Sequence, residues 1–176
     1  MIKENEEYIG NKVTNYKLIL NDGINIKVDE KLDLIFSTGV FQHIVLIDVI
    51  INYIKQGLKL LNDSGIFFFQ FMGFYTKLQG SGTNGAKITA KILNKYLKND
   101  KSINYKINEI NIDKHDPMKQ IWIVLQKTTL FNESERDFEK IKMIDRNFRT
   151  GVFDDLSKYN SVKKLWLRNA KQEIHK

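Results

Sequence analysis

Three small residues, Ser37, Thr38 and Gly39, directly follow a short apolar run and have the character of a ligand-binding loop. Small side chains let backbone groups approach a ligand closely, and open α/β sheets bind ligands at the carboxyl ends of their strands. Gln42 and His43 come shortly afterwards, and a histidine at this place can bind substrate or act as a general base. Because a lone histidine more often satisfies a local backbone group, both roles stay open for His43, and Gln42 shares the same alternatives.

Gly80–Gly85 matches the pattern G-x-G-x-x-G and is a second stretch with chemical potential. A dinucleotide fingerprint belongs at the immediate turn from a strand into a helix, with an acid about 20 residues further on. Here Gly73–Thr76 and other residues separate the glycines from the preceding apolar run, and the next helix begins near Thr89, a good N-cap residue. We interpret the segment as a lid over an active site, with Phe74 and Tyr75 facing substrate, and phosphate binding is the alternative.

A strand–helix–strand unit in the middle of the chain must position these loops. Leu32–Ser37 is a short apolar run that predicts a strand buried on both faces. Ile47–Leu61 carries apolar residues at helical spacing with Asp48 near its start, which predicts an amphipathic crossover helix. Asn62–Gly65 has the composition of a turn, and Ile66–Phe71 predicts a second buried strand. The three elements together form one βαβ unit, which is expected to be right-handed.

Further elements are expected on both sides of this unit. Tyr16–Leu20 predicts a strand that ends in the turn Asn21–Gly23, and Ala90–Lys98 predicts a short helix. Ser102–Asp113, with a bulge at Asn108 and Glu109, and Gln120–Gln126 predict the antiparallel pair that completes the sheet.

The remaining residues, 129–176, are rich in charge and contain two helical stretches. Ser134-Glu135-Arg136-Asp137 resembles a capping box and predicts a helix through about Asn147, with Phe138, Ile141 and Ile144 on one face. Ser161 is placed to cap a second helix. The apolar residues of this part need burial, so we expect an extension that packs on the domain rather than a free nucleic-acid arm. The expected organisation is a domain over residues 1–128 and a helical C-terminal extension over residues 129–176.

Composition restricts the class of protein further. The chain has 176 residues, 42% hydrophobic and 28% charged, as in one globular domain. It contains no run of about 18 apolar residues, no signal-peptide core and no cysteine, so we expect a cytoplasmic protein without a membrane partner. The net charge of +7 attracts polyanions, but the lysines are dispersed and lack the arginine and aromatic clustering of nucleic-acid-binding surfaces. His43, His115 and His175 have no ligand spacing, so no metal is expected.

The segment LDLIFSTGVFQHI, followed by a helix and by LKLLNDSGIFFFQF, resembles the strand-four to strand-five segment of class I S-adenosylmethionine-dependent methyltransferases. The similarity extends upstream to Asn21–Gly23 and downstream through Gly82–Thr89, and it rests on the order and spacing of these segments. The resemblance implies an α/β fold with a Rossmann-like methyltransferase sheet that ends in an antiparallel strand pair.

The same resemblance implies where S-adenosylmethionine would bind. Asp22 would accept a hydrogen bond from the adenine amino group, and the backbone amide of Gly23 would bind a ring nitrogen. Ser37, Thr38 and Gly39 would contact the methionine portion, and His43 matches a histidine that is common at its place. Taken alone, Asp22 and Gly23 suit a plain chain turn equally well.

Two parts of the family pattern have no counterpart in the sequence, namely the glycine-rich motif after strand one and the acid that ends strand two. The resemblance therefore implies an incomplete sheet that lacks strands one and two, which would lie between Tyr16–Leu20 and Leu32–Ser37. A fragment of a longer enzyme, a truncated gene product and a chain completed by a second subunit are the three explanations. With half of the cofactor contacts absent, we expect little or no independent methyl transfer.

The leading hypothesis is a fragment or truncated form of an S-adenosylmethionine-dependent methyltransferase. Its reaction would be displacement at the sulfonium methyl group, promoted by alignment and by a base. A small-molecule acceptor is favoured over nucleic acid or protein. The second hypothesis is a catalytically inactive methyltransferase-like module that binds a partner or nucleic acid, and the third is a nicotinamide-dependent oxidoreductase that uses Gly80–Gly85.

Overall fold

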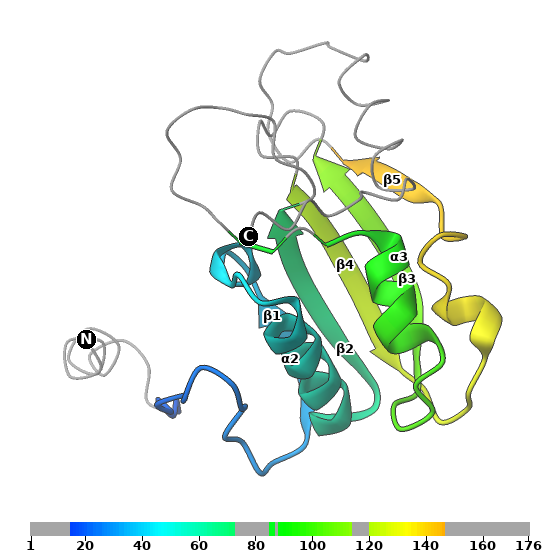
Figure 1. Ribbon diagram of the computed structural model, residues 1–176. Coiled ribbons are helices and arrows are strands. Elements are labelled where there is room, and N and C mark those ends of the chain that lie inside the picture. Colours follow the sequence, from blue (N-terminus) through cyan, green and yellow to red (C-terminus); the bar gives the residue numbers. More distant parts are fainter. Residues whose placement is uncertain (1–14, 73–84, 87, 114–119, 147–176) are drawn as a thin grey trace, which may run out of the picture.

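The computed structural model describes residues 15–72, 85–86, 88–113 and 120–146. Within these ranges one mixed sheet has the strand order β1-β2-β4-β3-β5 (Figure 1). β1 and β2 are parallel, β4 is antiparallel to both β2 and β3, and β5 is parallel to β3. The α/β class and the antiparallel pair are therefore confirmed. The strands are β1 (Leu32–Ser37), β2 (Leu61–Met72), β3 (Tyr105–Asp113), β4 (Gln120–Lys127) and β5 (Met143–Arg146).

The predicted strand–helix–strand unit is present as β1, helix α2 (Ile47–Leu60) and β2. The helix buries the apolar side chains that its spacing indicated, Ile50, Ile54 and Leu58 among them. β2 begins at Leu61, earlier than predicted, and the expected turn lies inside it as an irregularity. Leu32 pairs with Leu61 whereas Leu34 already pairs with Ile66, so residues 62–65 have no partner in β1.

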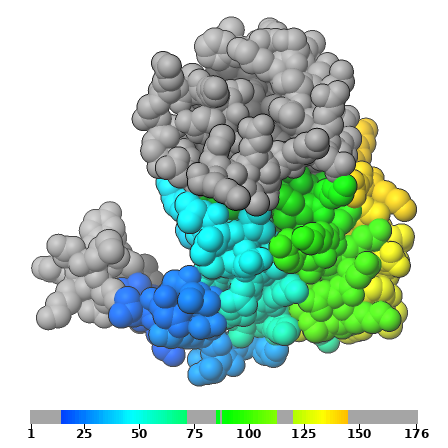
Figure 2. Space-filling model, viewed as in Figure 1, coloured from blue at the N-terminus to red at the C-terminus, as the bar shows by residue number. Residues whose placement is uncertain are grey.

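The described helices cover one face of the sheet. Helix α2 and helix α3 (Ala90–Leu93), which continues as the π-helical turn η2 (Asn94–Lys98), lie side by side on it (Figure 1). Figure 2 shows the same two regions as a continuous surface, cyan for α2 and green for residues 90–98. Thr89 caps α3 as predicted, since its side chain accepts a hydrogen bond from the backbone amide of Ile92. Alternate residues of β2, Phe67, Phe69 and Phe71, are buried in the core.

β1 is not buried on both faces, so this prediction was wrong. Leu34 is 59% and Phe36 is 68% exposed. β1 is the edge strand of the described sheet, and these alternate side chains point away from the face that is covered by the helices. Phe36 is the register partner of Phe68, whose ring stacks on Trp122 with 5.1 Å between the centroids. An apolar run therefore indicated a strand correctly but not its place in the sheet.

The strand predicted over Tyr16–Leu20 does not form. These residues have no regular secondary structure, and Leu20 is 71% exposed. A strand is stable only when its backbone groups pair with a neighbour, and no described strand lies beside this segment. The result agrees with the expectation that neighbouring strands are missing, but that expectation stays a prediction.

The helix predicted from Ser134 to about Asn147 is also wrong. Only a short 3-10 helix, η3 (Glu133–Arg136), forms there, and its N-cap is Asn132 instead of Ser134. The chain then continues to β5, which pairs with the edge of β3. Residues 143–146 are thus part of the main sheet. The boundary after residue 128 stays a prediction, and the helix expected after Ser161 lies outside the described residues.

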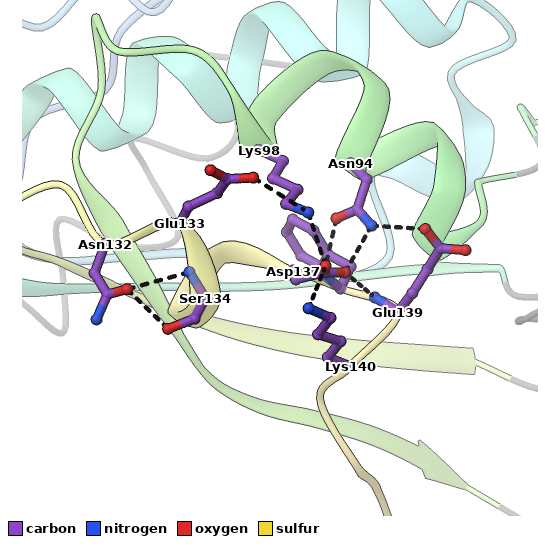
Figure 3. A network of polar contacts seen from close by, with 9 residues as sticks. Asn94, Lys98, Asn132, Glu133, Ser134, Asp137, Glu139 and Lys140 are labelled. Carbon is purple, nitrogen blue, oxygen red and sulfur yellow. Dashed lines mark hydrogen bonds and ion pairs between the residues drawn. The ribbon is translucent and has the colours of Figure 1, made fainter.

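Asp137 is the centre of a polar network that ends η3 and holds the following segment against η2 (Figure 3). Its carboxylate accepts hydrogen bonds from Lys98 Nζ at 2.8 Å, from Asn94 Nδ2 at 2.9 Å and from the backbone amide of Glu139 at 3.1 Å. Asn94 also uses its Oδ1 to accept the backbone amide of Phe138 at 2.9 Å. These tertiary hydrogen bonds explain why the capping-box sequence does not continue as a helix.

The same network predicts an acid-dependent contribution to stability. Burial alone would raise the pKa of Asp137, but the hydrogen bonds from Lys98, Asn94 and the Glu139 amide outweigh it and hold the pKa below its usual 3.8. Because the folded-state pKa is lowered, the ionised carboxylate stabilises the fold above about pH 4, and this contribution is lost as the pH falls further. We expect Asp137→Asn to cost about 1 to 2 kcal/mol at neutral pH.

The difference between wild type and Asp137→Asn should shrink in acid, which urea denaturation at a series of pH values would measure. Glu135→Gln is a suitable control because Glu135 is an exposed carboxylate only two residues from Asp137 in the chain. A difference that stays constant down to the lowest pH at which the chain folds would contradict the prediction.

Candidate functional site

The predicted loop Ser37–Gly39 lies directly at the carboxyl end of β1, as expected. Gly39 has a φ of 70°, a left-handed conformation that favours glycine. Its backbone amide donates a hydrogen bond to Oε1 of Gln70 at 2.9 Å. Gln70 belongs to β2 and is only 3% exposed. A buried side chain of the neighbouring strand therefore holds the loop in place.

A cleft of about 410 Å³ lies beside this loop, between residues 21–26 and the β1–α2 unit. This volume is within the range of small-molecule sites, which is about 300 to 1,000 Å³. Of the predicted cofactor-binding residues, the cleft brings together Gly23 and Ser37. The lining does not include Asp22, which precedes Gly23, nor Thr38 and Gly39, which follow Ser37. The other lining residues are mostly apolar: Asn21, Ile26, Ile35, Phe36, Val40, Phe41, Ile44, Tyr53 and Phe67.

Asp22 uses its carboxylate to build the turn in which it lies. The backbone amides of Asn25 and Ile24 donate to Oδ1 at 2.7 and 2.9 Å, and they hold the pKa of Asp22 well below its ordinary value. Gly23 has a φ of 83°, and its amide donates to Oδ1 of Asn21 at 3.0 Å. The geometry is therefore that of a local turn, and the role of Asp22 and Gly23 in binding adenine stays a prediction.

Two polar residues of α2 fix this turn segment, and the sequence analysis missed them. Gln56 Oε1 accepts the backbone amide of Ile26 at 2.8 Å, and Asn52 Nδ2 donates to the carbonyl of Ile24 at 2.9 Å. Asn52 and Gln56 have the spacing that places both on one side of a helix. The sequence did contain an indication of this role: two amide side chains occur at this spacing on a helix that was predicted to cover a strand.

Tyr53 is a further wall of the cleft that the sequence analysis did not single out. Its ring is stacked on Phe41 at a centroid distance of 6.3 Å. Burial and the nearby charge of Asp22 raise the pKa of Tyr53 above its usual 10.0. The phenol is therefore neutral at physiological pH and can donate a hydrogen bond.

Gln70 also connects the loop to the two polar residues that follow it. Gln70 Nε2 lies 3.5 Å from Oε1 of Gln42, and Nε2 of Gln42 lies 3.2 Å from Nε2 of His43. His43 is exposed at the end of the 3-10 helix η1 (Phe41–His43). The indication for Gln70 in the sequence was a single amide within the otherwise apolar run Ile66–Phe71.

Gly85, the last glycine of the G-x-G-x-x-G match, has a packing role in the described structure. A Cβ atom built on it would lie 1.9 Å from the carbonyl oxygen of Gln42, so only glycine allows this close approach. The amide of Ala86 next to it donates to the carbonyl of Ile44 at 2.8 Å. The other glycines of the match, and the proposed lid residues Phe74 and Tyr75, lie outside the described residues.

No group of three or more acidic or histidine side chains in residues 15–72, 85–86, 88–113 and 120–146 could hold a metal ion. His115 and His175 are not among these residues. None of the helices in this part of the chain is long and apolar enough to cross a membrane.

Comparison with known proteins identifies the fold. No protein-family model matches the sequence, and no curated protein matches it. The structure is similar to the crystal structure of a S-adenosylmethionine-dependent methyltransferase from Clostridium acetobutylicum ATCC 824. The TM-score is 0.54 at 14% sequence identity, over 72% of this chain and 71% of that chain. The chain therefore has a methyltransferase-like α/β fold, and the resemblance seen in the sequence is confirmed at the level of the fold.

Proposed function

We propose that this chain is a fragment or truncated form of an S-adenosylmethionine-dependent methyltransferase that binds its cofactor in the cleft beside Gly23 and Ser37. The observation that carries the proposal is the position of this cleft at the carboxyl end of β1, where open α/β sheets bind ligands. The cleft joins one residue from each of the two segments that the family resemblance assigned to the cofactor. The methyltransferase-like fold supports the same assignment.

The lining of the cleft suits part of this cofactor. Phe41 and Phe67 line the cleft with apolar, aromatic surface for a flat heterocycle, and the phenol of Tyr53 supplies a hydrogen-bond donor. The carboxylate of Asp22 already accepts two backbone amides, so an adenine amino group would share it with the turn. The fit is therefore good for the shape and polarity of a nucleoside ring, while hydrogen bonding to its edge requires the turn to adjust.

When bound, the cofactor supplies an electrophilic methyl group on a sulfonium centre. The chain's own residues hold and align the two reactants, which can account for much of the rate of such a displacement. Ser37, Thr38 and Gly39 would bind the methionine portion, and His43, exposed at the end of η1, would bind the acceptor. A small-molecule acceptor is favoured, with nucleic acid or protein as the alternatives.

The outer edge of β1 makes the proposed site incomplete. β1 has a neighbour only on the β2 side within the described residues, and Leu34 and Phe36 expose apolar surface. Such an edge is a template for pairing with another strand. We propose that a second subunit or an N-terminal segment completes the sheet and the cofactor site there, and that methyl transfer by this chain alone is slight or absent.

Calorimetric titration with S-adenosylhomocysteine tests the cofactor site. We expect the contacts on the Gly23 and Ser37 side to give the wild type measurable, although weakened, binding without the completing segment, and both Tyr53→Ala and Asp22→Ala to weaken it further by about tenfold or more. Tyr96→Ala is the matched control, because Tyr96 is a half-buried tyrosine of η2 outside the cleft lining, and binding should change less than about twofold. A folded wild-type chain that does not bind, or equal losses from the two tyrosine variants, would overturn the proposed site.

The alternative function is a catalytically inactive methyltransferase-like module that binds a partner or nucleic acid. The net charge of +7 favours it, because a basic chain attracts polyanions. Affinity for nucleic acid that falls steeply with salt and does not respond to S-adenosylmethionine would support this alternative over methyl transfer.

A further inference from the structure

A series of polar contacts starts at the partly buried backbone amide of Gly39 and ends at the exposed imidazole of His43. The amide of Gly39 donates to Oε1 of Gln70 at 2.9 Å, Gln70 Nε2 faces Oε1 of Gln42 at 3.5 Å, and Gln42 Nε2 faces Nε2 of His43 at 3.2 Å. Gln70 is 3% exposed, so its amide has little freedom to choose other partners.

The Gly39 amide determines which group donates and which accepts at every later contact of this series. A backbone N–H can only donate, so the side-chain oxygen of Gln70 must face Gly39 and its NH₂ group must face Gln42. Gln42 then presents its oxygen to Gln70 and its NH₂ group to His43. The nitrogen of His43 that meets this NH₂ group must therefore be an acceptor, which in a neutral imidazole leaves the proton on the other nitrogen.

The backbone around Gln42 is also held in place. The amides of His43 and Ile44 donate to the carbonyls of Val40 and Phe41 at 3.0 and 3.2 Å and form η1. Gly85 packs directly against the Gln42 carbonyl. Gln42 thus has a fixed main chain from which its amide spans Gln70 and His43.

We infer that Gln70 is a positioning residue which, through Gln42, holds neutral His43 in the tautomer that carries its proton on Nδ1. In this tautomer the lone pair of Nε2 is engaged by Gln42, and the other polar group of the ring is the Nδ1–H donor. His43 therefore presents a hydrogen-bond donor instead of a base. Under the proposed function, it would bind an acceptor substrate through an oxygen or nitrogen lone pair. Only this last step depends on the proposed function.

The tautomer can be observed directly by long-range ¹H–¹⁵N correlation spectra of the imidazole nitrogens. The double variant His115→Gln, His175→Gln leaves His43 as the single histidine and serves as the reference chain. Measurement at about pH 8.5 keeps an ordinary histidine neutral. We expect the nitrogen shifts of His43 in the reference chain to be those of a protonated Nδ1 and an unprotonated Nε2. A dominant Nε2–H tautomer, or a mixture of the two, would overturn the inference.

Gln70→Glu in the same background tests whether Gln70 controls the tautomer. The new carboxylate can still accept the Gly39 amide, but it has no N–H to offer Gln42. Gln42 should then turn its NH₂ group toward the carboxylate and its oxygen toward His43, so His43 should change to the Nε2–H tautomer. A merely structural role of Gln70 would not reverse the tautomer, and an unchanged spectrum in the folded variant would contradict the inference.

Gln42→Ala provides the second test, because Gln42 is only half-buried and its backbone contacts are kept. Without the amide, His43 should return to the tautomer mixture of free histidine, in which Nε2–H predominates. If Gln70→Glu does not fold, this variant decides the question alone: retention of the Nδ1–H tautomer would refute control by Gln42. Titration of the reference chain with S-adenosylhomocysteine separates the two proposals, since a fixed tautomer without binding would overturn the proposed function and leave the positioning role of Gln70 intact.

Discussion

Replacing Arg136 with alanine is expected to lower the free energy of unfolding by about 2 to 4 kcal/mol. Arg136 is fully buried, and its Nη2 donates to the carbonyls of Leu97 at 2.6 Å and Asp100 at 2.9 Å. Its guanidinium lies between the rings of Tyr105 and Phe131, 4.4 Å from each centroid. Burial raises the pKa of Tyr105 to about 12, so the ring beside the cation is a neutral phenol.

Three losses add up in this variant. The carbonyls at the end of η2 lose a charged donor, two cation–π contacts disappear, and a cavity replaces the side chain. A buried charge also costs free energy to desolvate, so Arg136→Met, which keeps much of the volume but removes the charge, should destabilise less than Arg136→Ala. Urea denaturation of both variants measures these differences.

Lys140→Ala is the matched control because it removes the same charge from a side chain that is 74% exposed and lies 3.9 Å from Asp137. We expect it to change stability by less than about 0.5 kcal/mol. Equal losses for Arg136→Ala and Lys140→Ala would show that burial of the guanidinium contributes nothing to the fold.

Gly85→Ala is expected to destabilise the fold by about 1 to 3 kcal/mol and to separate residues 85–86 from η1. The clash is with backbone, because the added Cβ would lie 1.9 Å from the Gln42 carbonyl oxygen and 2.5 Å from its carbon. Neither atom can move away without disturbing η1. The hydrogen bond from Ala86 to the Ile44 carbonyl should therefore weaken, which faster hydrogen exchange of the Ala86 amide would reveal.

Gly23→Ala is the control for Gly85→Ala, because it introduces backbone strain without a steric clash. A Cβ atom added to Gly23 would meet no heavy atom within 4 Å, but the φ of 83° at this position is unfavourable for alanine. This variant should cost about 1 to 2 kcal/mol through strain alone and leave exchange of the Ala86 amide unchanged. If Gly85→Ala also leaves that amide protected, the close approach of Gly85 to η1 is not needed for the fold.

Local patterns in the sequence were sufficient for the central unit and its immediate continuation. The apolar run Leu32–Ser37 and the helical spacing of Ile50, Ile54 and Leu58 predicted β1 and α2 close to their observed bounds. The bulge expected at Asn108 and Glu109 is present, because the register of β3 with β4 shifts between Ile107 and Glu109. Each of these features depends on residues that are neighbours in the chain, so short-range sequence carries the information.

Only the tertiary structure decided the elements whose partners are distant in sequence. Tyr16–Leu20 has a strand pattern but finds no neighbouring strand among the described residues, and Ser134–Asp137 has a capping pattern but binds Asn94 and Lys98 instead. The exposure of Leu34 and Phe36 likewise follows from the sheet face toward which they point, opposite the face covered by α2 and α3 (Figure 1), and their own residue types do not encode this.

The candidate site divides in the same way. Ser37, Thr38, Gly39 and His43 were predicted from their place after a strand, and the structure confirms that place. The site residues that the sequence analysis missed are Gln70, Asn52, Gln56 and Tyr53. Each of them contacts residues about 12 to 32 positions away in the chain. These contacts exist only because α2 and β2 pack against the loops. Hydrogen bonds and cleft walls of this kind depend on the relative placement of whole elements, and that placement is set by burial of the shared core, which no local segment determines alone.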